Sequence, residues 1–224
     1  MISVIIPTLN AAPFLARTLG PLVGGVASGL VKQAIVADGG SDDETIAIAE
    51  AAGCDVVACA RGRGAQLRAG AAAAKADWLL FLHADTSLDD AWTEEAARFI
   101  GGGAQRAAAF SLAFDDDSAG AAWVAFWAGA RSRALKLPYG DQGLLISRAL
   151  YDNIGGYRDL ALMEDVDIVR RIGARRLSIL RARAITSGDK YRRDGYLRRS
   201  SRNLVLLARY FLGADAAELA KGYD

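Results

Sequence analysis

The stretch Ile2-Ser3-Val4-Ile5-Ile6-Pro7-Thr8-Leu9-Asn10 decides the fold expected of this chain. Its first five residues are mostly β-branched and apolar, as in a buried strand, and a proline with polar neighbours follows them. Similar runs follow at Leu30–Ala37, Cys54–Ala58 and Trp78–Leu82. These four segments are therefore predicted to be strands of one sheet.

Alanine-rich segments with the apolar spacing of helices separate these runs, at Pro13–Leu22, Asp43–Ala52 and Ala65–Lys75. Strands that alternate with helices are joined by right-handed crossovers, which place the strands parallel and cover the sheet with helices. The sequence thus predicts an α/β fold with a Rossmann-like, mostly parallel central sheet flanked by helices.

The strict alternation is lost near residue 105. Beyond it the pattern predicts strands at Ala107–Phe114, Leu144–Ser147, Leu177–Leu180 and Ala182–Thr186, and helices at Ala119–Leu137, Glu164–Gly173 and from Arg192 to Leu212. A chain of 224 residues suits one domain. We expect a single domain over 1–224, with a nucleotide-binding half at 1–105 and an acceptor half with C-terminal helices at 106–224.

The composition is that of a soluble globular protein, with 52% hydrophobic and 24% charged residues. No apolar stretch reaches the roughly 18 to 20 residues of a membrane span. The two cysteines, Cys54 and Cys59, are too few for a disulfide framework and are typical of thiols in a reducing compartment. A cytoplasmic location is therefore expected.

Polar residues follow three of the predicted strands. They are Pro7-Thr8-Leu9-Asn10, Asp38-Gly39-Gly40-Ser41-Asp42-Asp43 and His83-Ala84-Asp85-Thr86. Any one of these segments could be an ordinary turn, since Gly, Asp, Ser and Asn dominate turns. In an open parallel sheet, however, ligands bind beyond the carboxyl ends of the strands, so we expect the three segments to form one site.

Asp85 is a candidate metal ligand. It follows Trp78–Leu82, the most hydrophobic run of the chain. Carboxylates suit Mg²⁺ or Mn²⁺, which bind through one or two of them together with substrate phosphates. The alternative for Asp85 is a helix N-cap before Ser87-Leu88-Asp89-Asp90. His83 is the only histidine, so it cannot form a zinc site by itself.

The segment Arg61-Gly62-Arg63-Gly64-Ala65-Gln66 precedes the third predicted helix. Guanidinium groups beside the free amides of a helix N-terminus indicate an anion site, and the alternative is a solvated loop. The segment lacks the Gly-Lys-Ser/Thr ending of a P-loop.

Glu164 and Asp165 begin a later predicted helix. The helix dipole favours an ionised acid there, and an ionised carboxylate is a candidate general base. The alternative is that both are first-turn acids that only stabilise the helix.

These motifs together resemble the family 2 glycosyltransferases, which have the GT-A fold. The matching segments are Ser3–Asn10, Val36–Thr45, His83-Ala84-Asp85 and Glu164-Asp165. A narrower resemblance, to a bacterial subfamily associated with arsenosugar biosynthesis and radical-SAM enzymes, rests on Gly62–Gln66, Phe81–Thr86, Gly140–Gly143 and Met163–Val166.

The resemblance implies transfer of a sugar from a nucleoside diphosphate sugar, by default a UDP-sugar, to an unknown acceptor hydroxyl with inversion. Asp85 would hold Mn²⁺ or Mg²⁺, and Asp165 would act as the base, with Glu164 beside it. The implied nucleotide-sugar-binding residues are Pro7, Thr8, Asn10, Asp38, Gly39, Ser41, Arg63, Gln66, His83 and Ala84. His83 stands where the family has the first acid of its Asp-x-Asp motif.

Two other functions fit parts of the pattern. A sugar-phosphate nucleotidyltransferase can use a similar sheet, although this chain lacks a glycine-rich, lysine-containing loop after the first strand. A non-catalytic nucleotide-sugar-binding protein would explain His83 and also Ala11, which replaces the usual glutamate of the first motif.

Positive charge gathers late in the chain, where residues 119–224 carry 19 Lys and Arg against 11 Asp and Glu. The segment Lys190–Arg209 predicts an amphipathic helix with a basic face. With Trp123, Phe126 and Trp127 it could form a peripheral contact with the anionic inner face of a membrane. The alternative is that these helices pack together or form a homodimer interface. Nucleic-acid binding is not expected, because no reader motif accompanies the arginines.

Overall fold

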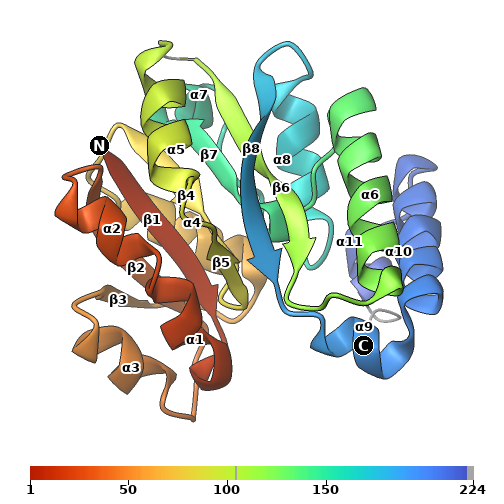
Figure 1. Cartoon of the computed structure of the whole chain (residues 1–224), viewed down its shortest axis with the longest axis horizontal. Helices are drawn as coiled ribbons and strands as arrows, with labels where there is room; N and C mark the ends of the chain where they lie inside the picture. Colours follow the sequence, from red (N-terminus) through yellow and green to blue (C-terminus); the bar gives the residue numbers. More distant parts are fainter. Residues whose placement is uncertain (104, 221–224) are drawn as a thin grey trace.

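The computed structural model describes residues 1–103 and 105–220, so residues 104 and 221–224 of the expected domain lie outside the described part (Figure 1). The strands are β1 (Ile2–Thr8), β2 (Val31–Asp38), β3 (Asp55–Ala58), β4 (Trp78–Phe81), β5 (Thr86–Leu88), β6 (Ala107–Phe114), β7 (Leu144–Ser147) and β8 (Leu177–Thr186). The helices are α1 (Ala12–Leu19), α2 (Leu22–Ala27), α3 (Thr45–Ala51), α4 (Arg63–Ala73), α5 (Trp92–Gly101), α6 (Ala119–Ala134), α7 (Arg148–Asn153), α8 (Glu164–Ile172), α9 (Asp189–Asp194), α10 (Tyr196–Phe211) and α11 (Ala216–Ala220), with a 3₁₀ turn, η1, at Gly140–Gln142.

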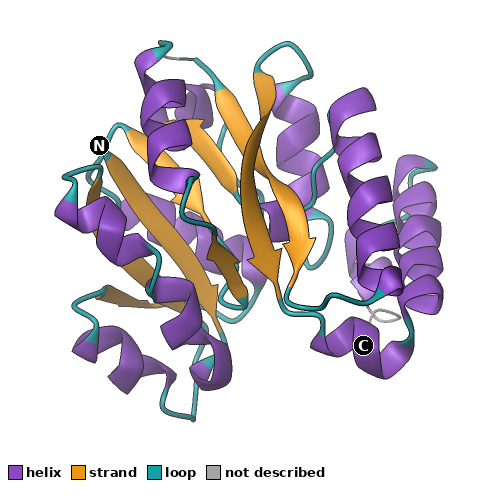
Figure 2. Cartoon of the chain, viewed as in Figure 1, coloured by secondary structure: helices purple, strands orange, loops and turns teal. Residues whose placement is uncertain are grey.

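One eight-stranded sheet runs through the molecule in the order β3-β2-β1-β4-β7-β6-β8-β5 (Figure 2). Strands β3, β2, β1 and β4 are mutually parallel, and β6 is parallel to β8. Strand β7 is antiparallel to both of its neighbours, and β5 is antiparallel to β8. The predicted α/β fold with a mostly parallel sheet is therefore confirmed.

Two hydrophobic cores cover the two faces of this sheet. Ile2, Val4 and Ile6 of β1 contribute to a core with residues of α1, α2 and α5. Ile5 and Ile35 contribute to the other, with residues of α4, α7 and α8. Successive residues of β1 thus point to opposite faces of the sheet, as the period of a strand requires, and buried apolar side chains cover both faces.

Several predicted elements differ from the observed ones. The first helix is divided at Gly20-Pro21 into α1 and α2, since a proline lacks the amide that a continuous helix needs. The two strands expected at Leu177–Leu180 and Ala182–Thr186 are one strand, β8. The last predicted helix is interrupted at Gly195, where φ is +85°, and becomes α9 and α10.

The segment after Asp85 is a strand, so the alternative of a helix N-cap at Asp85 is wrong. Thr86–Leu88 forms β5 and pairs with the end of β8, with Thr86 opposite Thr186. Strand β5 has three residues, too few for the alternation of apolar and polar residues to be recognised in the sequence. Strand β5 and helices α5, α7 and α11 were not predicted.

Among the described residues, no helix combines the length and the apolar character that crossing a bilayer requires. Cys54 and Cys59 are both free thiols.

Helix α4 lies close against β1, and Gly70 makes this contact. A Cβ at Gly70 would overlap Cγ2 of Ile5. We expect Gly70→Ala to lower the free energy of unfolding by about 1 to 3 kcal/mol, because overpacking outweighs the better helix propensity of alanine. Urea denaturation measures this change. Gly24→Ala in α2 is the matched control, since a Cβ there meets nothing within 4 Å; an equal loss in the control would contradict the packing argument.

Candidate active site

The carboxyl ends of β1 and β2 lie side by side, with Thr8 paired to Asp38. Thr8 Oγ1 donates a hydrogen bond to Asp38 Oδ1 at 2.9 Å, and Ser41 Oγ donates to the same oxygen at 2.5 Å. The backbone amides of Gly40 and Ser41 donate to Asp38 Oδ2 at 2.9 and 2.8 Å. Asp38 therefore organises the loop after β2.

Asp38 is almost fully buried, with 2% of its surface exposed. Burial by itself raises the pKa of Asp38, but the hydrogen bonds that its oxygens accept bring the pKa below its usual value. The loop is linked to the end of β1, because the amide of Asn10 donates to Ser41 Oγ and the amide of Asp42 donates to Asn10 Oδ1. The predicted association of these two strand ends is therefore present in the fold.

A first cleft, of about 500 Å³, opens at this edge of the sheet. The predicted residues that line it are Pro7, Thr8, Asn10, Arg63, Gln66, His83, Ala84 and Asp85. Three other predicted residues, Asp38, Gly39 and Ser41, are outside its lining and shape the adjoining loop. The structure thus brings together polar ends of β1 and β4 with the start of α4.

Gln66 fixes the floor of this first cleft. Its Nε2 donates to the carbonyl of Thr8 at 2.5 Å and to that of Ala37 at 3.1 Å. A Cβ at Gly39 would lie 3.1 Å from the same nitrogen. The side-chain amide of Gln66 is thus already used to join β1 to β2, and Gly39 leaves room for it.

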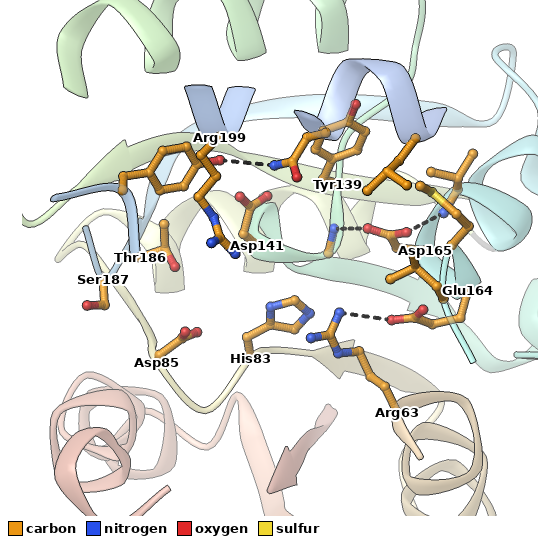
Figure 3. Close-up of a pocket in the computed structure, with 17 residues that line it drawn as sticks. Arg63, His83, Asp85, Tyr139, Asp141, Glu164, Asp165, Thr186, Ser187 and Arg199 are labelled. Carbon is orange, nitrogen blue, oxygen red and sulfur yellow. Dashed lines mark hydrogen bonds and ion pairs between the residues drawn. The ribbon is translucent and has the colours of Figure 1, made fainter. Parts of the chain in front are cut away.

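A second cleft has a volume of about 140 Å³. Figure 3 shows the side chains that line it. The two clefts share Arg63, His83, Asp85 and Ser187. The second cleft is further lined by Tyr139, Gly140, Asp141, Leu162, Met163, Glu164, Asp165, Val166, Thr186, Tyr191, Arg199, Asn203 and Leu206. Asp85 and Asp165, which are 80 residues apart in sequence, therefore line the same cavity.

Asp165 is held by two backbone amides. Its Oδ2 accepts from Gly140 N at 2.7 Å, and its Oδ1 accepts from Val166 N at 2.7 Å. A Cβ at Gly140 would lie 2.6 Å from Nε2 of His83 and 3.4 Å from Oδ2 of Asp165. Glycine lets this turn approach the ring of His83 closely, and the Asp165 carboxylate keeps lone pairs for a ligand.

Glu164 faces the same cleft but is 2% exposed and paired with Arg63, whose Nη1 lies 3.2 Å from Glu164 Oε1. Burial raises the pKa of Glu164, and Arg63 offsets part of that increase. The pair connects the start of α4 with the start of α8 across 101 residues of sequence. Arg63 is thereby placed between the two clefts.

Among the residues that the structure describes, the Asp85 carboxylate accepts one long hydrogen bond, 3.5 Å, from Thr86 Oγ1. Within residues 1–103 and 105–220, no three His, Cys, Asp or Glu residues gather as a metal site. A cation at Asp85 would therefore take most of its ligands from a substrate and from water. This donor set fits Mg²⁺ or Mn²⁺ and does not fit zinc.

Asp141 is a site residue for which the sequence indicated no role. It lies in η1 and faces the second cleft, and its Oδ1 atom is buried with no hydrogen-bond partner among the described residues. Burial raises the pKa of Asp141 to about 6, and Arg131 offsets part of the increase. The negative charges of Asp165 and Asp85 raise the pKa of Asp141 further. Gly140–Gly143 is one of the segments that carry the narrower resemblance, but that resemblance assigned no role to Asp141, and the fold shows its carboxyl in the cleft.

The raised pKa of Asp141 predicts a pH-dependent stability. The folded protein buries the protonated form of Asp141 more easily than the charged form. The resulting contribution to the free energy of unfolding is fully present below the ordinary pKa of 3.8 and is lost as the pH rises through about 6. Asp141→Asn should leave the free energy of unfolding nearly unchanged in acid and raise it above pH 7 by up to about 3 kcal/mol. Denaturation in EDTA at several pH values measures this, with the exposed Asp152→Asn as control. A constant difference at all pH values would contradict it.

Solved structures share this fold. A Staphylococcus aureus TarS fragment (1–349) in complex with UDP-GlcNAc superposes with a TM-score of 0.65 and is 18% identical, with 83% of this chain and 58% of that fragment covered. Glucosyl-3-phosphoglycerate synthase from Mycobacterium tuberculosis, in complex with Mn²⁺, UDP and glucosyl-3-phosphoglycerate, gives a TM-score of 0.58 at 20% identity, with 84% of this chain and 70% of that one covered. At these identities the likeness shows the fold, which is that of GT-A glycosyltransferases.

Sequence comparison gives the family. The model of glycosyl transferase family 2 matches residues 3–158, and the chain belongs to this family. No curated protein matches the chain. The chain spans 58% of the length of the TarS fragment.

Proposed function

We propose that this protein transfers a sugar from a nucleoside diphosphate sugar, by default a UDP-sugar, to an acceptor hydroxyl with inversion. The observation that carries the proposal is the junction of the two clefts, where Asp85 lines both clefts and Asp165 lines the second. Family membership supports the reaction class. The narrower resemblance, to the arsenosugar-associated and radical-SAM-associated subfamily, stays a prediction about the pathway.

The first cleft would hold the nucleoside and the diphosphate. Thr8 and Asn10 lie at the end of β1, where ligands bind in open α/β sheets. Arg63 lies at the start of α4, so its guanidinium and the amides there favour an anion. Asp38 would act indirectly, through the loop that its hydrogen bonds organise.

Asp85, at the junction of the clefts, would hold Mn²⁺ or Mg²⁺. When bound, such a cation neutralises the charge that develops on the departing diphosphate. His83 lies beside it and would contact the diphosphate or the sugar. The glucosyl-3-phosphoglycerate synthase structure contains Mn²⁺ with UDP, which supports a divalent cation in a fold of this kind.

The second cleft would hold the acceptor. Its hydroxyl oxygen attacks the anomeric carbon as the carbon–oxygen bond to the diphosphate breaks, and its proton passes to the Asp165 carboxylate. The amides of Gly140 and Val166 orient this carboxylate. Glu164 would be a positioning residue that holds Arg63.

Asp165→Asn tests the proposed base. The variant should keep donor binding, because the first cleft is unchanged, and lose about 10² to 10⁴ in kcat, since the amide cannot take the proton. Donor affinity by calorimetry and sugar transfer to a panel of acceptors are the two measurements. The exposed Asp152→Asn is the control. Transfer at the rate of the unmodified protein would show that Asp165 is not the base.

Asp85→Ala tests the cation site. Binding of the nucleoside diphosphate should strengthen with Mn²⁺ in the unmodified protein, and this dependence should disappear in the variant. The exposed Asp90→Ala, five residues later, should behave like the unmodified protein. If Asp85→Ala bound donor and turned over normally in EDTA, the metal assignment would be wrong. Release of pyrophosphate from a nucleoside triphosphate and a sugar phosphate would instead indicate nucleotidyl transfer.

A further inference from the structure

Helices α6 and α10 lie side by side at one end of the molecule (Figure 1). Both helices carry large apolar side chains that are exposed. Gly120 of α6 lies directly against the ring of Tyr196 in α10. The exposed apolar residues of α6 are Trp123, Phe126 and Trp127, and those of α10 and its end are Leu197, Leu204, Val205, Phe211 and Leu212. Phe126 is 68% exposed and Leu204 63%. We call these eight residues the aromatic–aliphatic face.

Helix α10 has a separate inner side that already has its own contacts. Leu206 and Leu207 are buried, and Leu206 packs with Leu162 and with Leu219 of α11. Arg199 and Asn203 line the second cleft. The outward apolar residues of α10 therefore serve neither the described core nor the cleft.

The charge of the two helices is of one sign. Neither α6 nor α10 contains Asp or Glu, whereas together they contain six arginines: Arg131, Arg133, Arg198, Arg199, Arg202 and Arg209. Arg133, Arg198 and Arg209 are exposed. Asp194, the acid just before α10, already contacts Arg193 and Arg199.

We propose that the aromatic–aliphatic face binds the surface of an anionic lipid bilayer. Tryptophan, phenylalanine and leucine enter the boundary between headgroups and acyl chains, and arginines beside them contact the phosphates. Exposed large apolar residues mark an interaction site on a water-soluble fold. The proposal goes beyond the glycosyl transfer proposed above, which requires no membrane.

Charge selects the bilayer over a second copy of this chain. A two-fold interface places the same patch on both subunits. Two such faces would bring their arginines together with no carboxylate on either helix to pair with them, which is unfavourable. An anionic lipid surface supplies the missing negative charge. Since α10 also lines the second cleft, the bilayer would lie about one helix diameter, roughly 10 Å, from that cleft.

Vesicle binding by the full chain tests the proposal. The probes are vesicles of equal parts phosphatidylglycerol and phosphatidylcholine, and vesicles of phosphatidylcholine alone, with co-sedimentation as the measurement. Trp78 and Trp92 are buried, so quenching of fluorescence by brominated lipid reports on Trp123 and Trp127. We expect binding and quenching with the anionic vesicles, weakened by salt.

Two variants and two matched controls locate the surface. Phe126→Ser with Leu204→Ser should weaken partitioning at least about tenfold, since both apolar side chains are removed. Arg198→Gln with Arg209→Gln should weaken it about 25-fold, because each arginine near an anionic surface contributes about fivefold. Val23→Ser with Val26→Ser in α2, and Arg181→Gln in β8, change residues that are also exposed but lie elsewhere, and they should have no effect.

Several results would overturn the proposal. They are absence of binding to anionic vesicles, equal binding to both kinds of vesicle, or an equal loss in the control variants. A dimer in lipid-free sedimentation that Phe126→Ser with Leu204→Ser dissociates would show that the face binds a second copy instead. Unchanged donor affinity in every variant would confirm that each is folded, and it separates this test from the test of glycosyl transfer.

Discussion

The antiparallel pairing of β4 with β7 is the constraint on which the site depends. Phe81 at the end of β4 lies opposite Leu144 at the start of β7. Residues that follow β4 and residues that precede β7 must therefore meet at one edge of the sheet. This brings His83 against Gly140, whose amide in turn holds Asp165. If β7 were parallel to β4, the loop that precedes β7 would lie at the opposite edge of the sheet.

The same pairing concentrates negative charge. Asp85, Asp141, Glu164 and Asp165 line one cavity of about 140 Å³, which Arg63 also faces. Burial raises the pKa of Asp141 and of Glu164, so the folded protein holds carboxyls in an environment that disfavours their charge. Such an arrangement costs stability and is typical of functional sites, where a cation or a proton relieves it.

The fold was largely predictable from the sequence, because buried parallel strands and their polar ends are local patterns. Strands β6 and β7 were predicted at their observed bounds. The site was only partly predictable. Asp141 lies in Gly140–Gly143, a motif whose resemblance assigned it no role, and its place in one cleft with Asp165 follows from strand pairing, which is not local. The sequence also could not show that the Asp38 carboxylate accepts hydrogen bonds from Ser41 and Thr8, since the contact with Thr8 depends on the register of β1 against β2.

Helix α10 shows a different limit of sequence patterns. Its sequence indicates one basic face and one apolar face, as expected of a surface helix that packs on a core. In the fold, Leu206 and Leu207 are buried while Leu197, Leu204 and Val205 point to solvent, so apolar residues lie on two sides. One side completes the second cleft, and the other has no partner in the described chain. Burial, rather than hydrophobic periodicity, therefore separates a helix that only packs from one that also presents a binding surface.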